Sequence, residues 1–439
     1  MATVTQGIFA TDQHVDEALP HNWRASVARW YPQGTAKFTA ATAMMRKETI
    51  DSYRTTWWTQ GYPIQVGDIT DIFADSALTT PIAAATTALG TVVYAQVAQA
   101  FAREFRKGHE VRFQDPDAPT YSKVGRVVDV NRNGGANSWV AIELRETDAA
   151  VNGVSLINAT RLMVIGSSHS QAAPSPVNLV YHPENKYNLT QINRTALKIS
   201  GTALNTTTRF GSPEHQRQRE DAFLRQQLEM EKTYLFGVRS EAYDDENEAT
   251  ITTMDGMWTW AMREAPDGQI VNYHDLGMTG VWVTDGWQML MEFFEILFRK
   301  SSKRTLNALD CYCGSGVALA LTDLAAAVGH INITPDTKRF GLGVSEWRTP
   351  FGSVFLQVHP LFNIEPALRH SMLFFNGDGI THCPMRNRDL HFKPASTPMK
   401  KTGEVGYDGI VEEYLCEDTI RWGIGEDYGI ATNIGVKYP

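Results

Sequence analysis

The sequence predicts an α+β fold, in which strands and helices come in runs rather than in regular β-α-β alternation. A β-rich stretch covers residues 108–165, a long helical pattern follows over 213–236, and a strand hairpin lies near 341–362. We find no internal repeat.

Composition and charge are those of an ordinary globular chain. A length of 439 residues suggests two or three domains or one large irregular one. With 43% apolar and 20% charged residues, wholesale disorder is disfavoured. The 40 Lys and Arg residues against 49 Asp and Glu give a net charge of −9, which disfavours a protein that wraps nucleic acid through its bulk charge.

The cysteines and the first residues bear on the cellular compartment. Cys311, Cys313, Cys383 and Cys416 are too few and too unevenly spaced for a disulfide scaffold, and they fit a reducing cytosol. The first residues, MATVTQGIFATDQHVDE, have neither a basic region nor an apolar one, so we expect no secretory signal.

Residues 1–62 are rich in aromatic side chains but show little periodicity. We expect an extended arm that packs on another surface, because a free tail with this many large aromatics would be insoluble. The aromatics are Trp23, Trp30, Tyr31, Tyr53, Trp57 and Trp58.

Residues 76–102 carry no charge and could span a bilayer by length alone. Thr, Gln, Ser, Pro and Gly dilute their apolar content, so a membrane span is disfavoured. We expect a segment packed against protein that ends in an amphipathic helix. Its apolar positions would be Val97, Ala100, Phe101 and Phe105.

Short strands are predicted within 108–165. Residues 123–130 and 138–144 are β-rich, and the turn NRNGGAN separates them. Residues 167–178 form a Ser/Pro/Ala connector. The whole stretch is predicted to be a β excursion on two flexible stalks.

A long helix is predicted over 213–236. Ser212 suits its N-cap, Pro213 its first position, and Gly237 its end. We expect one apolar stripe of this helix to pack against a sheet. The stripe consists of Leu224, Leu228 and Leu235. The opposite face, which should be wet or contact a neighbour, carries Arg217, Arg225 and Glu229.

The remaining chain mixes loops, helices and strands. Residues 241–257 are predicted to be an acidic loop, with six acids and no base. Helices are expected after Thr284 and over 317–328. Two strands flank the turn at 349–352, and another strand and turn lie at 371–380.

The strongest sign of an enzyme is the run DCYCGSG from Asp310 to Gly316. It resembles the first motif of methyltransferases that bind S-adenosylmethionine, where a glycine-rich turn lets the backbone approach the cofactor. Too little α/β sequence follows, and 321–335 reads as helix and turn instead of a second strand ending in an acid. A structural strand-to-helix turn is therefore favoured, and the methyltransferase stays as the alternative function.

Other candidate sites are weaker. The acidic run Asp244–Glu248 lacks the glycine and spaced glutamate of an EF-hand loop. Cys311 and Cys313 do not have zinc-finger spacing. The basic cluster at 299–304 is best explained as a helix C-terminus. We therefore predict no catalytic, cofactor-binding or metal-binding residue and no enzyme.

The order of parts resembles the major capsid protein of tailed double-stranded DNA bacteriophages, the Hong Kong 97-type fold, in a branch with a long β insertion before its long "spine" helix. The resemblance covers most of the chain. It is carried by NLTQINRTALKISGTAL (188–204), QREDAFLRQQLEMEKTYLFG (218–237), TMDGM (253–257), the hairpin GLGVSEWRTPFGSVFLQVHPLF (341–362) and the C-terminal segments 418–422 and 431–434.

This resemblance implies five segments. Residues 1–62 would be the N-terminal arm and 63–178 the extended loop with its β insertion. Residues 179–262 would form the peripheral domain with the spine helix 213–236, residues 263–395 the axial domain, and 396–439 the return strands of the peripheral domain.

The resemblance also implies a structural protein. It would assemble in the bacterial cytoplasm into hexamers and pentamers of an icosahedral or prolate head, with scaffold, portal and decoration proteins as further partners. The shell would enclose DNA without sequence-specific binding and without a membrane.

Overall fold

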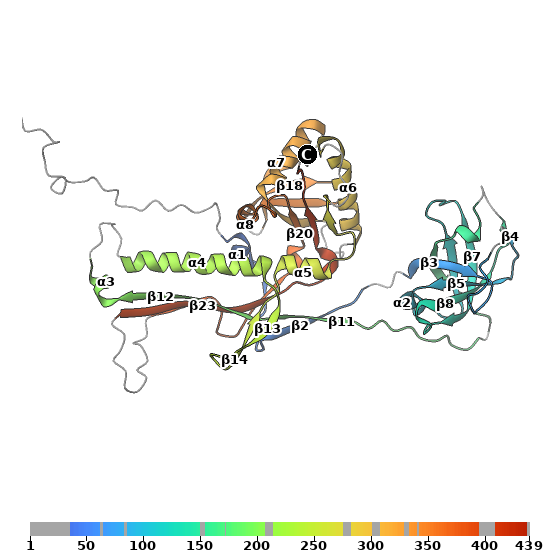
Figure 1. The fold of residues 1–439 in the computed structure, drawn as a ribbon, viewed down its shortest axis with the longest axis horizontal. Coiled ribbons are helices and arrows are strands. Elements are labelled where there is room, and N and C mark those ends of the chain that lie inside the picture. Colours follow the sequence, from blue (N-terminus) through green and yellow to red (C-terminus); the bar gives the residue numbers. More distant parts are fainter. Residues whose placement is uncertain are drawn as a thin grey trace, which may run out of the picture. The chain divides into compact units, whose positions relative to one another are not determined.

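The chain divides into two compact units (Figure 1), Gln60–Glu184 and Met1–Thr59 with Asn185–Pro439. In this computed structural model the described residues are 36–61, 65–82, 86–149, 154–171, 173–206, 214–274, 282–300, 308–328, 333–339, 342–394 and 409–436. Both helices and strands are present in mixed order, so the predicted α+β class is confirmed.

A five-stranded sheet lies in the larger unit. Its strands run in the order β1-β21-β23-β12, with β22 also paired to β23. The bounds are β1 (Arg46–Lys47), β12 (Gln191–Ser200), β21 (Thr381–Pro384), β22 (His391–Lys393) and β23 (Gly409–Arg421). The antiparallel ladder of β12 with β23 runs from Gln191 opposite Asp418 to Ser200 opposite Gly409 and makes a long platform.

Helix α4 (Glu214–Phe236) packs along this platform, beside β12 and β23 (Figure 1). The predicted long helix is thus present, and its 23 residues span about 34 Å. Polar bonds tie it to the sheet: Gln226, fully buried, donates to the Asn193 carbonyl at 3.0 Å and accepts from Thr195 Oγ1 at 2.5 Å. A short helix, α3 (Gly201–Asn205), connects β12 to the chain before α4.

The predicted leucine stripe of α4 is wrong in part. Leu235 is buried, but Leu224 and Leu228 are only half-buried. The face that is buried recurs every four residues and consists of Ala222, Gln226, Met230 and Tyr234. Counting leucines missed this face because two of its members are polar groups whose hydrogen-bond partners lie on distant strands.

A seven-stranded sheet forms the second layer of the same unit. Its order is β15-β24-β20-β16-β19-β18-β17. The bounds are β15 (Ile270–Asn272), β16 (Ala308–Cys313), β17 (Ile333–Arg339), β18 (Leu342–Arg348), β19 (Ser353–Val358), β20 (Met372–Phe375) and β24 (Gly429–Thr432). The predicted hairpin, now β18–β19, and the predicted strand near 371 are both confirmed.

Two helices pack on this sheet around one apolar core. Helix α6 (Trp282–Lys300) buries Leu290, Phe294 and Leu297, and α7 (Ser315–Val328) buries Val317, Leu321 and Leu324. They meet Trp347 and Phe374 of the sheet. Two shorter helices, α5 (Met257–Glu264) and α8 (Pro360–Ile364), lie against the other large core, which α4 shares.

Each of the two sheets contains strands from both sides of the predicted domain boundary at 395/396. β21 and β22, which the prediction gave to the axial domain, pair with β23 in the five-stranded sheet. β24, predicted as a peripheral return strand, lies in the seven-stranded sheet. Because strand pairing joins segments far apart in sequence, cutting the chain into consecutive blocks cannot reproduce these sheets.

The expectation that residues 1–62 pack on another surface is wrong for residues 36–59. Helix α1 (Lys37–Thr42) buries Phe38 completely, and its ring contacts those of Tyr234, Tyr312, Phe375 and Trp422 in the chain's own core. β1 extends the five-stranded sheet, and β2 (Arg54–Thr59) pairs with β11 (Glu184–Leu189). Residues 1–35 lie outside the described residues.

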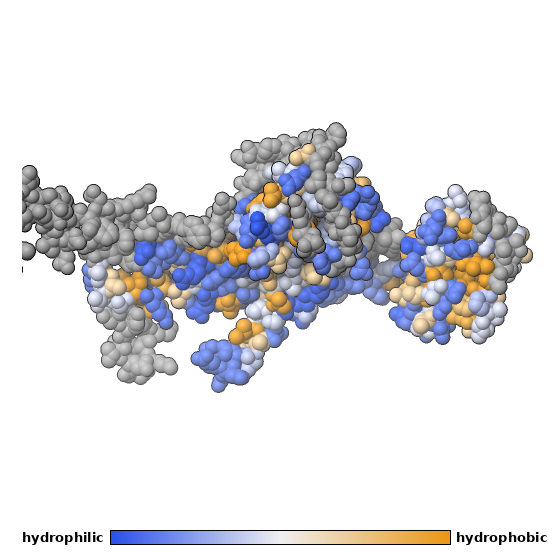
Figure 2. Space-filling view, turned by 45° about the horizontal axis from the view of Figure 1, so that its top comes forward, coloured by the Kyte–Doolittle hydropathy of each residue, from blue (hydrophilic) through white to orange (hydrophobic). Residues whose placement is uncertain are grey.

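The predicted acidic loop at 241–257 is a hairpin followed by the start of α5. β13 (Ser240–Asp244) pairs with β14 (Ala249–Thr253), and four residues turn between them. The β-branched residues of β14 favour a strand, and the acids gather in the turn. Figure 2 shows the end of this hairpin as hydrophilic surface.

The smaller unit is a closed six-stranded barrel, in the order β10-β3-β5-β8-β7-β6. Its strands are β3 (Val66–Phe73), β5 (Val92–Val97), β6 (His109–Gln114), β7 (Ser122–Asn131), β8 (Trp139–Leu144) and β10 (Arg161–Ser167). Alternate residues point inward, and Val93, Phe113 and Leu162 are fully buried. Beside it β4 (Thr86–Thr87) pairs with β9 (Asp148–Ala149).

The predicted strands of 108–165 are confirmed, and the predicted amphipathic helix is present but is shorter than the stretch from Val97 to Phe105. β5 continues to Val97, and α2 covers only Gln99–Ala102. The β-branched run before Val97 favours the strand. Among the described residues, no helix has the length and apolar character that crossing a membrane requires.

Replacing Tyr234 with Phe tests the helix–sheet contact. Tyr234 is buried and donates its hydroxyl to Asp418 of β23, so Tyr234→Phe removes one donor from a buried carboxylate. We expect the free energy of unfolding of unassembled subunits to fall by about 1–3 kcal/mol in chemical denaturation. The control is Tyr243→Phe, whose side chain is exposed on β13 and should change stability by less than about 0.5 kcal/mol. Equal losses in both variants would contradict the contact.

Candidate functional site

A highly connected polar group of the described structure is the Glu231 carboxylate of α4, which is buried. It accepts hydrogen bonds from the backbone amides of Phe38 and Thr39 and from Thr39 Oγ1, each at 2.7 Å. These amides belong to the first turn of α1, where helix donors lack intrahelical partners. Since Ala36 provides no side-chain cap, Glu231 serves as the cap of α1 from another helix.

His359 completes this group from the end of β19. Its Nδ1 accepts from the Leu361 amide at 3.3 Å and thereby caps α8. Its Nε2 lies 2.7 Å from Glu231 Oε1 and donates to it, because a neutral ring that accepts at one nitrogen donates at the other. Glu231 and His359, both buried, therefore join α1, α4 and α8 across the boundary between the two sheets.

A second buried carboxylate, Asp418 of β23, fixes α4 to the five-stranded sheet. It accepts from Tyr234 and from His382 Nε2 at 2.8 Å. Burial, followed by the charge of Asp418, raises the pKa of Tyr234 well above its ordinary value, so the tyrosine stays a hydrogen-bond donor. Asp418 thereby fixes the position of α4 relative to strands β23 and β21.

The segment TMDGM packs directly on the end of α4. The Gly256 amide donates to the Gly237 carbonyl at 2.9 Å, and a Cβ on Gly256 would lie 2.5 Å from the Gly237 nitrogen. Asp255 is buried and paired with Arg263, and its carbonyl accepts from Trp422 Nε1 at 2.8 Å. Here the glycines allow two backbones to touch.

The turn from Asp310 to Gly316 does join a strand to a helix, β16 to α7, but the chain itself fills the space around it. A Cβ on Gly314 would lie 2.2 Å from the Arg369 carbonyl oxygen, and one on Gly316 would lie 2.6 Å from the His370 ring. The first amide of α7, that of Ser315, donates to Asn363 Oδ1 at 2.7 Å. Asp310 is buried and accepts from the Gly377 amide at 3.2 Å.

This arrangement leaves no approach for a cofactor at that turn. In a methyltransferase, S-adenosylmethionine would lie against these glycines, but here residues 369 and 370 occupy that space. The first amide of α7 already donates to Asn363 and is not available to a cofactor. The methyltransferase alternative is therefore not supported.

The four cysteines are buried and free. Burial raises the pKa of the Cys313 thiol to about 12 and that of Cys383 to about 11, and it also raises the pKa of Cys311 and of Cys416. All four stay protonated at neutral pH and lack the thiolate that a nucleophilic cysteine requires. Within the described ranges, no three His, Cys, Asp or Glu side chains meet as a metal site.

The two charged runs noted in the sequence have ordinary local partners. Asp244 accepts from the Glu246 amide at 3.1 Å and from Asn247 Nδ2 at 2.6 Å, which orders the hairpin turn. Arg299 pairs with Glu295 on α6 at 3.5 Å. Residues 301–304 of the basic cluster lie outside the described residues.

Sequence reasoning missed the groups that organise the large unit. Glu231 and His359 are separated by 128 residues, and Tyr234 and Asp418 by 184. No local signal marks Glu231 as the buried acid, because Glu229 adjoins the same buried Met230 and is exposed.

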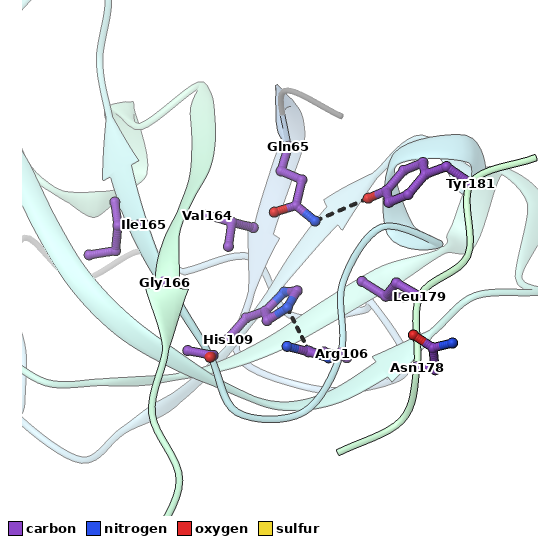
Figure 3. A pocket seen from close by; sticks show the side chains of 10 residues that line it. Gln65, Arg106, His109, Val164, Ile165, Gly166, Asn178, Leu179 and Tyr181 are labelled. Atoms are coloured by element: carbon purple, nitrogen blue, oxygen red, sulfur yellow. Dashed lines mark hydrogen bonds between the residues drawn. The ribbon is translucent and has the colours of Figure 1, made fainter. Parts of the chain in front are cut away.

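A pocket of about 470 Å³ opens in the barrel unit (Figure 3). It lies between strands β6 and β10 on one side and the extended segment 178–181 on the other. Arg106, His109, Asn178 and Tyr181 contribute polar groups, while Val164 and Leu179 contribute apolar surface.

Comparisons with known proteins identify the class as a structural subunit of a virus head. The family model described as SU10 major capsid protein matches residues 13–414, and the chain therefore belongs to this family. The resemblance drawn from the sequence is thus confirmed: the chain is a major capsid protein of phage heads. No curated protein matches it.

Several solved structures are similar over much of the chain. A Microbacterium phage Oxtober96 protein is 11% identical, with 95% of this chain and 96% of that one covered and a TM-score of 0.44. A Mycobacterium phage Bobi protein is 6% identical, with coverages of 97% and 99% and a TM-score of 0.44. The holo-SrpI encapsulin complex from Synechococcus elongatus PCC 7942 is 10% identical, with coverages of 60% and 80% and a TM-score of 0.38.

Substituting Gly314 tests whether the 310–316 turn is structural. A methyl group there would clash with the Arg369 carbonyl, so we expect Gly314→Ala to lower the melting temperature by several degrees or abolish soluble expression. The control is Gly61→Ala, because a Cβ at Gly61 meets nothing within 4 Å. Two results would contradict a structural turn. One is a melting temperature of Gly314→Ala equal to that of the wild type, and the other is a rise in the melting temperature of the wild-type protein when S-adenosylmethionine is added.

Proposed function

We propose that this capsid protein builds the head of a tailed phage with the Hong Kong 97-type architecture. Copies would assemble in the bacterial cytoplasm into hexamers and pentamers that close as an icosahedral or prolate shell around double-stranded DNA. Scaffold, portal and decoration proteins would be its further partners.

The observation that best supports this proposal is α4 fixed along the β12–β23 ladder. A 23-residue helix that Gln226 ties to the ten-residue strand β12, and that Tyr234 ties to β23, forms a stiff strut. Glu231 of the same helix adds bonds to α1 and His359. Such a strut lets contacts at one end of a subunit set the position of the other end, which a closed shell requires.

We assign the parts by sheet instead of by consecutive blocks. The five-stranded sheet with α4 would be the peripheral domain, and the seven-stranded sheet with α6 and α7 the axial domain. The barrel within 60–184 would be the β insertion of the extended loop. The N-terminal arm would be confined to the residues before α1, because Phe38 already belongs to the core.

We also infer that the protein acts without catalysis and holds DNA without reading it. The protonated thiols and the filled turn at 310–316 support the first inference. The net charge of −9 supports the second, because an acidic shell does not adhere to packed DNA.

Electron microscopy of the purified protein tests this function. Expressed alone or with a scaffold protein and treated with nuclease, the protein should give closed shells, or rings of five and six subunits. Assembly should not require DNA. A protein that stays monomeric or dimeric at high concentration in both preparations would contradict the proposal.

A further inference from the structure

The barrel pocket contains the guanidinium of Arg106, which no carboxylate of the described part of the barrel unit contacts. Arg106 Nε donates to His109 Nε2 at 3.0 Å, and Nη1 donates to the Val177 carbonyl at 3.2 Å. Both partners are neutral, and within the described residues Arg106 makes no ion pair with a carboxylate. Some barrel cations do have one, such as Lys107 with Asp129 at 3.1 Å and Arg161 with Asp68 at 3.0 Å. Arg126 and Arg132 instead donate to backbone carbonyls.

These two bonds hold the guanidinium in place while leaving donors unused. A guanidinium has five N–H groups in a planar fork, and the described contacts use two of them. Figure 3 shows Arg106 beside the His109 ring at the pocket wall. Its position is therefore fixed before any ligand arrives, which lowers the entropy cost of binding.

His109 adds a second incomplete polar group. Because its Nε2 accepts from Arg106, its proton lies on Nδ1, and this buried nitrogen has no partner in the described structure. Burial, together with the charges of Arg106, His169 and Arg132, lowers the pKa of His109 to about 4. The ring stays neutral, and the potential around it is positive.

The rest of the lining matches an acceptor ligand. Tyr181 Oη accepts from Gln65 Nε2 at 3.1 Å, so its own proton is available to donate, and Asn178 adds an amide. None of the lining residues is acidic. The nearby Glu110 is engaged with Ser168, whose hydroxyl donates to it.

We propose that this pocket binds an oxyanion carried on an organic group, through the Arg106 guanidinium with Tyr181 as a second donor. The volume of about 470 Å³ exceeds that of a lone oxyanion and lies within the range of small-molecule sites. Val164 and Leu179 offer apolar surface for the attached group.

Two sources share this chemistry. One is a small organic phosphate or carboxylate from solution. The other is an acidic side chain of a neighbouring copy in the shell, and only this source rests on the proposed function.

Binding of inorganic phosphate and acetate to full-length unassembled subunits tests the site. In calorimetric titrations at constant ionic strength, we expect phosphate to bind wild-type protein and to bind Arg106→Gln at least tenfold more weakly. Tyr181→Phe, which removes only a hydroxyl, should weaken binding severalfold. Arg145→Gln is the matched control, because Arg145 lies on the same barrel near Glu143, away from the pocket lining. Unchanged melting temperatures would exclude a folding defect.

Assembled shells separate the two sources. Phosphate binding to shells and free subunits alike identifies a small anion from solution. Binding to free subunits alone, with Arg106→Gln impairing assembly, identifies the acidic side chain of a neighbour. Absence of phosphate and acetate binding to free wild-type subunits, or equal binding by Arg106→Gln and Arg145→Gln, would overturn the proposal without touching the capsid function.

Discussion

The buried Glu231 carboxylate is the interaction on which the larger unit depends. It satisfies two first-turn amides of α1, the hydroxyl of Thr39 and the Nε2 proton of His359. A buried charge is tolerated only when such donors surround it, and removing either side leaves unpaired polar groups in an apolar core. Through this one group, α4 on the five-stranded sheet holds α1 and also the start of α8, which follows the seven-stranded sheet's β19.

Similar polar ties recur along α4 and β23. Glu412 of β23 pairs with Arg219 and His215 near the helix start, Gln226 bonds to β12 in the middle, and Asp418 meets Tyr234 near its end. With apolar contacts alone, a shift of a long helix along a sheet would cost little free energy. Directional bonds at intervals along its length select one register, and a shell subunit needs that register in every copy.

Local patterns predicted local structure well. Gly237 marked the end of α4, and turn residues around Thr349 marked the β18–β19 hairpin. Several of the failures share one physical cause, which is long-range pairing. The inward face of α4 includes Gln226 because its partners lie on β12, and α1 is a core element because Phe38 meets rings from distant segments. The turn after Asp310 matched a cofactor motif because close backbone packing requires glycine for the same steric reason that cofactor binding does.

The most direct test of the central claim is amide hydrogen exchange across α1 in unassembled subunits carrying Glu231→Gln. The substituted amide offers N–H groups to donors that need an acceptor, so the Phe38 and Thr39 amides should exchange at least tenfold faster than in the wild type, while the β12–β23 ladder stays protected. Glu229→Gln, on the exposed face of the same helix, should leave α1 unchanged. Wild-type protection of α1 in Glu231→Gln would show that apolar packing of Phe38 alone holds it, and would contradict the account.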